Sequence, residues 1–163
     1  MSGSRPQALS LQEISDRLLI QDLLVEEAAS IDERAWERWE AVYTPDAVVD
    51  WSGNSGAAGT PAEVRAWAEP VLSTDNFPYP QYQHYCTNFQ IRVDGDQATS
   101  RHLQIIPISV PSPGGGRQIG FSGIWFDDRL VRTIDGWRIC ERHEQLAWNH
   151  NFPDAYQVPD PGA

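Results

Sequence analysis

Three residues of this 163-residue chain stand out as candidates for proton transfer: Asp32, His84 and His102. Histidine titrates near neutral pH, and a neighbouring carboxylate stabilises the imidazolium form and selects the ring nitrogen that holds the proton. A plainer interpretation exists for each residue. Asp32 could cap the helix that follows it, and an isolated histidine on a strand is usually part of the packing. The elements that carry the three side chains decide between these interpretations.

The two histidines lie on consecutive predicted strands. Because side chains alternate along a strand, His84, Cys86 and Asn88 share one face of the first long strand. His102 lies in the middle of the next strand, on the same face as Gln104. If the two strands are neighbours in one concave sheet, both imidazoles point into its hollow. Cys86 could be a nucleophile beside His84, but a small buried thiol is the plainer expectation.

Helical signals fill the first half of the chain. Ser10 and Glu13 form a capping-box pattern, and apolar residues recur behind them at helical spacing. Thr60, followed by a proline and then by Glu63, is a second helix start. Pro45 is expected to end the helix before it. These signals predict helices over residues 11–29, 33–42 and 61–72, and a strand over residues 47–51.

The second half of the chain is rich in extended segments separated by turn residues. Strands are predicted over residues 84–93, 97–110, 117–133 and 137–146. Helices followed by consecutive hairpins indicate an α+β fold, with the helices packed on a strongly curved antiparallel sheet that encloses a pocket. We expect a single domain over residues 1–163, with its core at about 9–146 and a tail at 147–163.

The composition excludes several functions. The net charge is −11, and all 12 basic residues are arginines. Without lysine there is no Schiff-base chemistry, no P-loop lysine and no lysine base. An acidic chain without a basic cluster argues against nucleic acid and anionic membranes as partners. No apolar run is long enough to span a membrane and no signal peptide is recognisable, so we expect a cytoplasmic protein with reduced thiols at Cys86 and Cys140.

A metal site is the competing interpretation of the histidines. The chain contains His84, His102, His143 and His150, but no closely spaced ligand pair of the helical or finger type. The glycine run at residues 114–116 lacks the lysine and the helix of a phosphate loop and fits a hairpin turn instead. We therefore expect neither a metal nor a cofactor.

Four segments of the chain resemble a known family: "LQEISDRLLIQDLL", "SIDERAWERWEAVYTPDAVVDW", "QHYCTNFQIRVDGDQATSRHL" and "DRLVRTIDGWRICER". In this order they resemble the SnoaL-like branch of the nuclear transport factor two superfamily, with likeness to scytalone dehydratase and to the lindane dehydrochlorinase. The resemblance covers roughly Leu9 to Glu144. It implies a cone-shaped α+β barrel with a mostly apolar pocket at its wide end. The family includes dehydratases, cyclases, isomerases, dehalogenating lyases and inactive members.

The resemblance also assigns roles to the three polar residues. Asp32 matches the buried acid of the family's D-x-x-x-W segment, with Trp36 as the aromatic residue. His84 matches the histidine that acts as general base in the dehydratase and the dehydrochlorinase. His102 matches the second histidine of the dehydratase, which works with the aspartate. These matches imply an Asp–His acid–base system, although they do not say which histidine pairs with Asp32.

Other positions depart from the family pattern. Ile31 and Trp51 stand where the dehydratase has two tyrosines that polarise the substrate carbonyl. Ile31 cannot donate a hydrogen bond, and Trp51 can donate only through its indole N–H. Glu27 stands near the position of the pocket lysine of the dehydrochlorinase. The electrophilic part of the site is therefore expected to differ from that of either enzyme.

Together these features predict a cofactor-independent dehydratase, cyclase or isomerase. His84 would remove a proton from an activated carbon, Asp32 would orient a histidine, and His102 would protonate the leaving group. The substrate is expected to be small and hydrophobic, of a polyketide, aromatic or steroid-like kind. Candidate substrate-binding residues are Tyr43, Trp51, Asn88, Phe121, Trp125 and Trp148.

Two other functions are compatible with the same fold. One is a non-catalytic protein that binds a small molecule, and the other is a structural subunit like the β chain of ring-hydroxylating dioxygenases. The polar trio favours the enzyme, because a structural subunit does not need two inward histidines beside an acid. Self-association as a homodimer or a homotrimer is expected, because the open sheet of this fold usually packs against a second copy.

Overall fold

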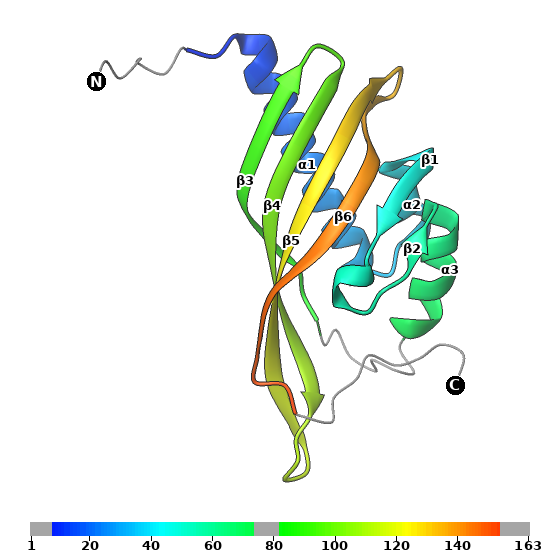
Figure 1. The fold of residues 1–163 in the computed structure, drawn as a ribbon, viewed down its shortest axis with the longest axis vertical. Coiled ribbons are helices and arrows are strands. Elements are labelled where there is room, and N and C mark those ends of the chain that lie inside the picture. The colour runs from blue at the N-terminus through cyan, green and yellow to red at the C-terminus, as the bar shows by residue number, and fades with distance from the viewer. Residues whose placement is uncertain (1–7, 74–81, 154–163) are drawn as a thin grey trace.

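The computed structural model describes residues 8–73 and 82–153. The helices are α1 (Leu11–Asp32), α2 (Trp36–Ala41) and α3 (Pro61–Val71), with a short 3-10 helix, η1 (Ser52–Asn54). The strands are β1 (Tyr43–Asp50), β2 (Ala58–Gly59), β3 (Tyr85–Asp94), β4 (Gln97–Pro111), β5 (Arg117–Thr133) and β6 (Gly136–His150). Figure 1 shows α1 crossing one face of the long strands, with α2 and α3 grouped beside β1 and β2.

The strands form one curved and unclosed sheet in the order β2-β1-β6-β5-β4-β3. Strands β3 to β6 are an antiparallel meander, and β2 is antiparallel to β1. The predicted α+β fold, with helices on a curved sheet, is confirmed. The sheet is mixed rather than wholly antiparallel, because β1 runs parallel to β6. A parallel pair needs a long connection, here the whole segment from β1 to β6, and turn residues do not reveal it.

The first strand begins earlier than the sequence indicates. Pro45 was expected to end the preceding helix, but β1 already starts at Tyr43 and α2 is confined to Trp36–Ala41. The pairing of β1 with β6 shifts register between Tyr43 and Val48. A proline has no N–H to donate to a ladder, and such an irregularity is a place where a strand tolerates it.

Helices α1 and α3 begin where their capping residues predict. The Ser10 hydroxyl accepts the N–H of Glu13 at 3.1 Å and starts α1, which continues to Asp32, three residues beyond the expected end at residue 29. Thr60 and Glu63 form the complete capping box of α3. Because α1 is longer than predicted, Asp32 is its last residue and not the cap of α2, whose N-cap is Ala35.

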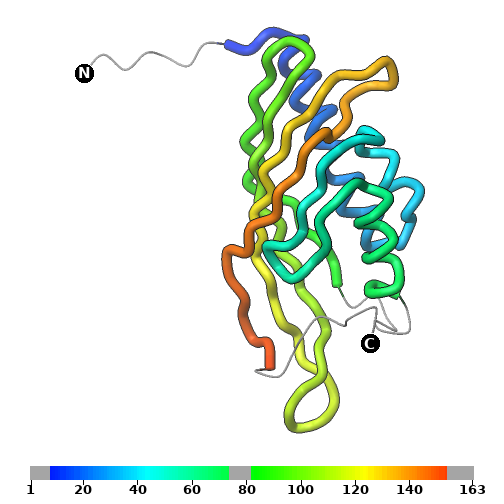
Figure 2. Tube along the Cα trace, turned by 45° about the vertical axis from the view of Figure 1, so that its right-hand side comes forward, coloured from blue at the N-terminus to red at the C-terminus, as the bar shows by residue number. Residues whose placement is uncertain are grey.

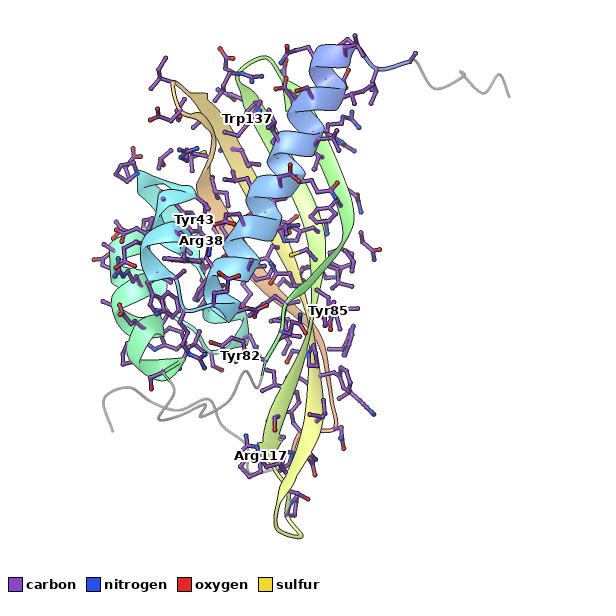
Figure 3. The ribbon with its side chains drawn as sticks, turned by 180° about the vertical axis from the view of Figure 1, so that it is seen from behind. Arg38, Tyr43, Tyr82, Tyr85, Arg117 and Trp137 are labelled. Carbon is purple, nitrogen blue, oxygen red and sulfur yellow. The ribbon has the colours of Figure 1, made fainter. Side chains whose placement is uncertain are left out.

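The core lies between the helices and the concave face of the sheet. Ile20 and Leu24 of α1 are fully buried, and Trp39 of α2 packs edge-on against Trp51 with ring centroids 5.3 Å apart. Figure 3, seen from behind, shows α1 in front of the strands. The far ends of β4 and β5 extend beyond the helices (Figures 1 and 2), so the layer of helices covers only part of the sheet.

The end of β6 differs from the expected C-terminal tail. Residues 147–150 continue the strand, whereas the sequence placed them in a tail at 147–163. Residues 154–163 lie outside the described part of the chain, so their course across the body stays a prediction. Within residues 8–73 and 82–153, no helix combines the length and apolar character that a bilayer crossing requires.

Candidate active site

The closest contact between a predicted acid and a predicted base joins Asp32 and His84. Asp32 is the last residue of α1, and His84 immediately precedes β3. The Nδ1 atom of His84 lies 2.6 Å from Oδ1 of Asp32, and the backbone N–H of His84 donates to Oδ2 at 3.0 Å. With Nδ1–H donated to the carboxylate, Nε2 keeps its lone pair and makes no hydrogen bond among the described residues. The pair is therefore arranged as an oriented base.

A cavity of about 130 Å³ lies beside this pair, with His84 in its wall. Its lining comes from the end of α1, from α3, from η1 and the loop after it, and from the long strands. Figure 3 shows Tyr82 where the chain approaches β3, between the long strands and the smaller helices. The lining residues are Ile31, Trp51, Asn54, Gly56, Trp67, Val71, Leu72, Tyr82, His84, Gln104, Ile106, Ile108, Ile124, Phe126 and Glu144.

Trp51 is the one predicted substrate-binding residue in this lining. Its side chain is largely buried, with 8% exposed, and its ring packs on Trp39. The indole N–H has no hydrogen-bond partner among the described residues. A buried N–H normally has a partner, so this donor is available to a ligand.

Glu144 on β6 is a second polar residue of the cavity wall, and the sequence analysis did not select it. Its Oε2 accepts the backbone N–H of Asn54 at 2.9 Å. Burial raises the pKa of Glu144 to about 8, and the nearby carboxylate of Asp50 acts in the same direction. A Cβ atom on Gly53 would come within 2.3 Å of the Glu144 carbonyl oxygen, so a glycine is needed for η1 to lie against β6. Near neutral pH Glu144 is a neutral acid that can donate a hydrogen bond.

A β-bulge explains why Glu144 faces inward. Trp137 and Ile139 are buried, and strict alternation would continue with residues 141 and 143. Pairing with β5 instead shifts register at Cys140, after which Arg142 and Glu144 take the inward positions. One extra residue reverses which face each later side chain occupies, and only the strand pairing reveals it.

His102 does not join Asp32. Its side chain is fully buried, and its Nδ1 lies 3.4 Å from Oδ2 of Asp128. Phe89 and Phe126 stack on the two sides of the imidazole, each with ring centroids 5.5 Å away. The expected convergence of Asp32 with both histidines is therefore not what the structure shows. His84 pairs with Asp32, and His102 has its own carboxylate.

His102 contacts the cavity wall through Gln104. The Nε2 atoms of the two side chains are 3.3 Å apart, and Gln104 is in the cavity wall. Because Nδ1 of His102 faces the carboxylate of Asp128, the proton is expected on Nδ1, with Nε2 accepting from the amide of Gln104. His102 thus holds a lining residue in place without lining the cavity itself.

Asp128 belongs to a buried network of charges. Nε of Arg142 donates to Oδ1 of Asp128 at 2.6 Å, and Nη1 of Arg142 forms an ion pair with Oε2 of Glu27 at 2.6 Å. Burial alone would raise the pKa of Asp128, but Arg142 and His102 outweigh it and lower the pKa to about 2. Tyr43 donates its hydroxyl to Glu27 at 3.0 Å, so this predicted substrate-binding residue belongs to the network and not to the cavity wall.

Four further predicted substrate-binding residues lie outside the cavity wall. Phe121 and Trp148 are exposed, and Trp125 packs under the guanidinium group of Arg101 at 4.8 Å. Asn88 lies at a register irregularity of β3 with a positive φ of 55°. On β5 the even-numbered residues face the cavity, as Ile124 and Phe126 do, so the odd-numbered Phe121 and Trp125 face away.

Cys86 and Cys140 are free thiols, and burial raises the pKa of Cys86 to about 12, so its thiolate is disfavoured as a nucleophile. In the described ranges, no three His, Cys, Asp or Glu side chains are grouped in a way that could hold a metal ion.

Solved structures of the same fold cover most of the chain. A candidate aromatic ring hydroxylase from Novosphingobium aromaticivorans is 26% identical, with a TM-score of 0.68 over 87% of this chain and 93% of that one. The hexachlorocyclohexane dehydrochlorinase LinA-type3 from Novosphingobium barchaimii is 18% identical, with a TM-score of 0.68 over 91% and 98%. A candidate scytalone dehydratase from N. aromaticivorans is 14% identical, with a TM-score of 0.69 over 91% and 93%.

The sequence comparisons identify the family. The uncharacterized protein Rv2910c of Mycobacterium tuberculosis is 43% identical over 136 residues, which are 83% of this chain and 88% of the relative. An uncharacterized protein of Mycobacterium bovis matches to the same extent. The model of the SnoaL-like domain matches residues 12–143, which include both Asp–His pairs and most of the cavity wall. The chain belongs to the SnoaL-like domain family.

Proposed function

We propose that this protein is a cofactor-independent acid–base enzyme, a lyase or an isomerase, which removes a proton from a carbon atom of a small hydrophobic molecule. The observation that carries the proposal is the Asp32–His84 pair at the wall of an apolar cavity. Two neighbours of the same fold, the dehydrochlorinase and the candidate scytalone dehydratase, are named for eliminations, which supports the same class of chemistry here.

The mechanism follows from how the imidazole is held. Asp32 accepts Nδ1–H, so Nε2 of His84 takes the proton from the substrate carbon. The electron pair of the broken C–H bond forms a new double bond. In a lyase the leaving group departs with its own bonding pair, and in an isomerase the proton returns at another carbon. The carboxylate of Asp32 stabilises the imidazolium, and the apolar wall excludes water and strengthens this interaction.

His102 has a positioning role in this proposal. It lies behind the cavity wall and holds Gln104, whose side chain reaches the ligand space. The expected proton transfer from His102 to a leaving group would have to pass through Gln104, an amide that does not titrate. We therefore assign proton abstraction to His84 and orientation of the wall to His102.

The experiment uses a probe that reports a positioned base whatever the natural substrate is. A nitro-substituted benzisoxazole loses its ring C–H proton to a base, the N–O bond breaks, and a coloured phenolate forms. His84→Ala should slow this reaction by about 10²- to 10⁴-fold. His150→Ala and Asp22→Asn, which change exposed residues of the same types, should not. Wild-type protein no faster than His84→Ala would refute the base.

A second candidate function is a structural subunit of a ring-hydroxylating oxygenase. It is favoured by the 26% identity to a candidate aromatic ring hydroxylase. In that case the protein should co-elute with a larger iron-containing chain when the two are expressed together, and His84→Ala should leave the oxygenase activity unchanged. If the two chains do not co-elute and the benzisoxazole reaction depends on His84, the enzyme is favoured.

A further inference from the structure

We infer that the cavity has two polar poles. The first is His84, and the second is formed by Trp51 and Glu144, which donate two hydrogen bonds to one uncharged acceptor group of the ligand. The ligand is then a neutral molecule with a carbonyl or similar oxygen at the end far from His84. This inference rests on the proposed function only in taking the cavity as the substrate site.

The first donor is the indole N–H of Trp51. It is buried and has no partner among the described residues, although its ring is firmly held against Trp39. The indole nitrogen can donate but cannot accept a hydrogen bond, so its partner must be an acceptor. A buried donor without a partner is rare in a folded protein, and a ligand oxygen would satisfy it.

The second donor is the carboxyl group of Glu144. Its Oε2 accepts the Asn54 backbone N–H, which leaves Oε1 to carry the acidic proton of the neutral form. Glu144 lies in the cavity wall together with Trp51, and Gly53 between them lets η1 lie against β6. The sequence from Trp51 to Asn54 thus supplies one donor directly and fixes the other by a backbone hydrogen bond.

The charges around Glu144 favour its neutral form. Burial has the largest influence and raises the pKa of Glu144 to about 8, and Asp50 on β1 and Glu27 on α1 act in the same direction. The backbone N–H of Asn54 and the charge of Arg142 on β6 lower this pKa, but burial outweighs them. Two other titratable side chains, His84 and Tyr82, lie in the described cavity wall. The Tyr82 phenol stays neutral where Glu144 titrates, because burial raises the pKa of Tyr82 to about 12. Below its own pKa Glu144 donates a hydrogen bond, and above it the carboxylate would repel an acceptor oxygen.

The cavity wall also limits the charge of the ligand. The lining contains no arginine among the described residues, and the chain has no lysine, so an anionic ligand would meet no fixed positive charge in this wall.

The two poles lie on different parts of the sheet. His84 precedes β3 and Glu144 is on β6, with β4 and β5 between them. Apolar side chains of these middle strands, among them Ile106, Ile124 and Phe126, form the wall between the poles. The ligand therefore has an apolar body, an acceptor oxygen at one end and an acidic C–H at the other.

Three ligands of nearly equal size test this inference by calorimetry: acetophenone has a neutral acceptor, ethylbenzene lacks the oxygen, and benzoate is an anion. Near pH 7, acetophenone should bind about 10- to 100-fold more tightly than ethylbenzene, because each of the two hydrogen bonds contributes about 3- to 10-fold. Benzoate should bind most weakly. Equal binding of acetophenone and ethylbenzene, or tightest binding of benzoate, would overturn the inference.

Two variants locate the effect. Trp51→Phe keeps a ring but removes the donor, so it should reduce the preference for acetophenone over ethylbenzene. Glu144→Gln keeps a donor that does not titrate. Wild-type protein should bind acetophenone more weakly near pH 9 than near pH 7, whereas Glu144→Gln should bind it equally at both. An unchanged preference in Trp51→Phe, with the same thermal midpoint as wild type, would remove Trp51 from the pole.

The same measurements in a His84→Ala background separate this inference from the proposed function. Binding there involves no proton abstraction. If the preference for acetophenone is absent while the benzisoxazole reaction depends on His84, only the second pole is wrong. If the preference is present while no reaction depends on His84, the pole stands and the protein is a binding protein.

Discussion

The molecule contains two aspartate–histidine pairs, and they differ in almost everything except composition. Asp32 and His84 lie at the ends of elements and are partly accessible, with 21% and 11% of their side chains exposed. Asp128 and His102 lie in the middle of β5 and β4 and are fully buried. The first pair borders the cavity, whereas the second is covered by aromatic rings and by the guanidinium group of Arg142.

Position within an element decides what such a pair can do. A residue at the end of a helix or before a strand has few packed neighbours, so one side of His84 is free to meet a ligand. A residue in the middle of a central strand is enclosed on both sides, and its charge must be compensated inside the protein. The first pair is suited to chemistry, and the second to holding the wall behind it.

The largest expected effect is on stability, at the buried pair. Asp128→Ala removes the partner of both Arg142 and His102 and leaves a buried guanidinium group without one of its carboxylates. Removing one member of a buried pair typically costs about 3–5 kcal/mol. Chemical denaturation should show a loss of this size in the free energy of unfolding. A loss below about 1 kcal/mol would mean that the two pairs do not differ as described.

The next effect is on catalysis, at the cavity pair. His84→Ala should reduce proton abstraction by about 10²- to 10⁴-fold, while the thermal midpoint stays close to that of wild type. His102→Ala should instead lower the thermal midpoint, because it leaves a void between Phe89 and Phe126. Parallel rate and melting measurements on the two variants check this, and a reversed pattern would exchange the roles of the histidines.

A smaller effect concerns the pH dependence of stability and sharpens the contrast between carboxyl groups. The folded protein raises the pKa of Glu144 from 4.5 to about 8, so between these values the folded state binds more protons than the unfolded state. Stability therefore falls as the pH rises through this range. Glu144→Gln should remove this fall, worth about 2 kcal/mol after allowance for solvent screening.

Asp128 should show the opposite dependence. Its pKa is lowered to about 2, so its contribution to stability is present above the unfolded value of 3.8 and is lost as the pH falls toward 2. Denaturation curves of wild type and Glu144→Gln across the pH range would separate the two groups. Identical curves for the two proteins between the two pKa values of Glu144 would show that this side chain is ionised at neutral pH.

The smallest effect is on the stability of the cavity pair itself. Asp32→Asn should lower the free energy of unfolding by less than about 1 kcal/mol, because the pair is partly accessible and solvent screens it. The same change should slow the benzisoxazole reaction, since a neutral amide at this position would no longer stabilise the imidazolium. A loss comparable to that of Asp128→Ala would make Asp32 a structural residue and would favour the plainer interpretation of this position.

The local signals in the sequence were sufficient for the longer helices and strands and for the Asp32–His84 part of the site. Ser10 and the Thr60–Glu63 capping box mark the starts of α1 and α3 because a cap is a local hydrogen bond. The strands from β3 to β6 follow from turn residues and alternation. Asp32 and His84 were selected by residue type and by resemblance, and the structure brings them into contact.

Local patterns were therefore enough to predict the longer helices and strands, the absence of lysine chemistry and the residues able to act as acid and base. Which partner each residue meets depended on the folded structure. In the folded structure β1 pairs in parallel with β6, His102 pairs with Asp128, and Glu144 faces inward after the bulge at Cys140. The physical reason is that caps and turns are short-range, whereas strand register depends on contacts between distant segments, and one inserted residue exchanges the two faces of a strand.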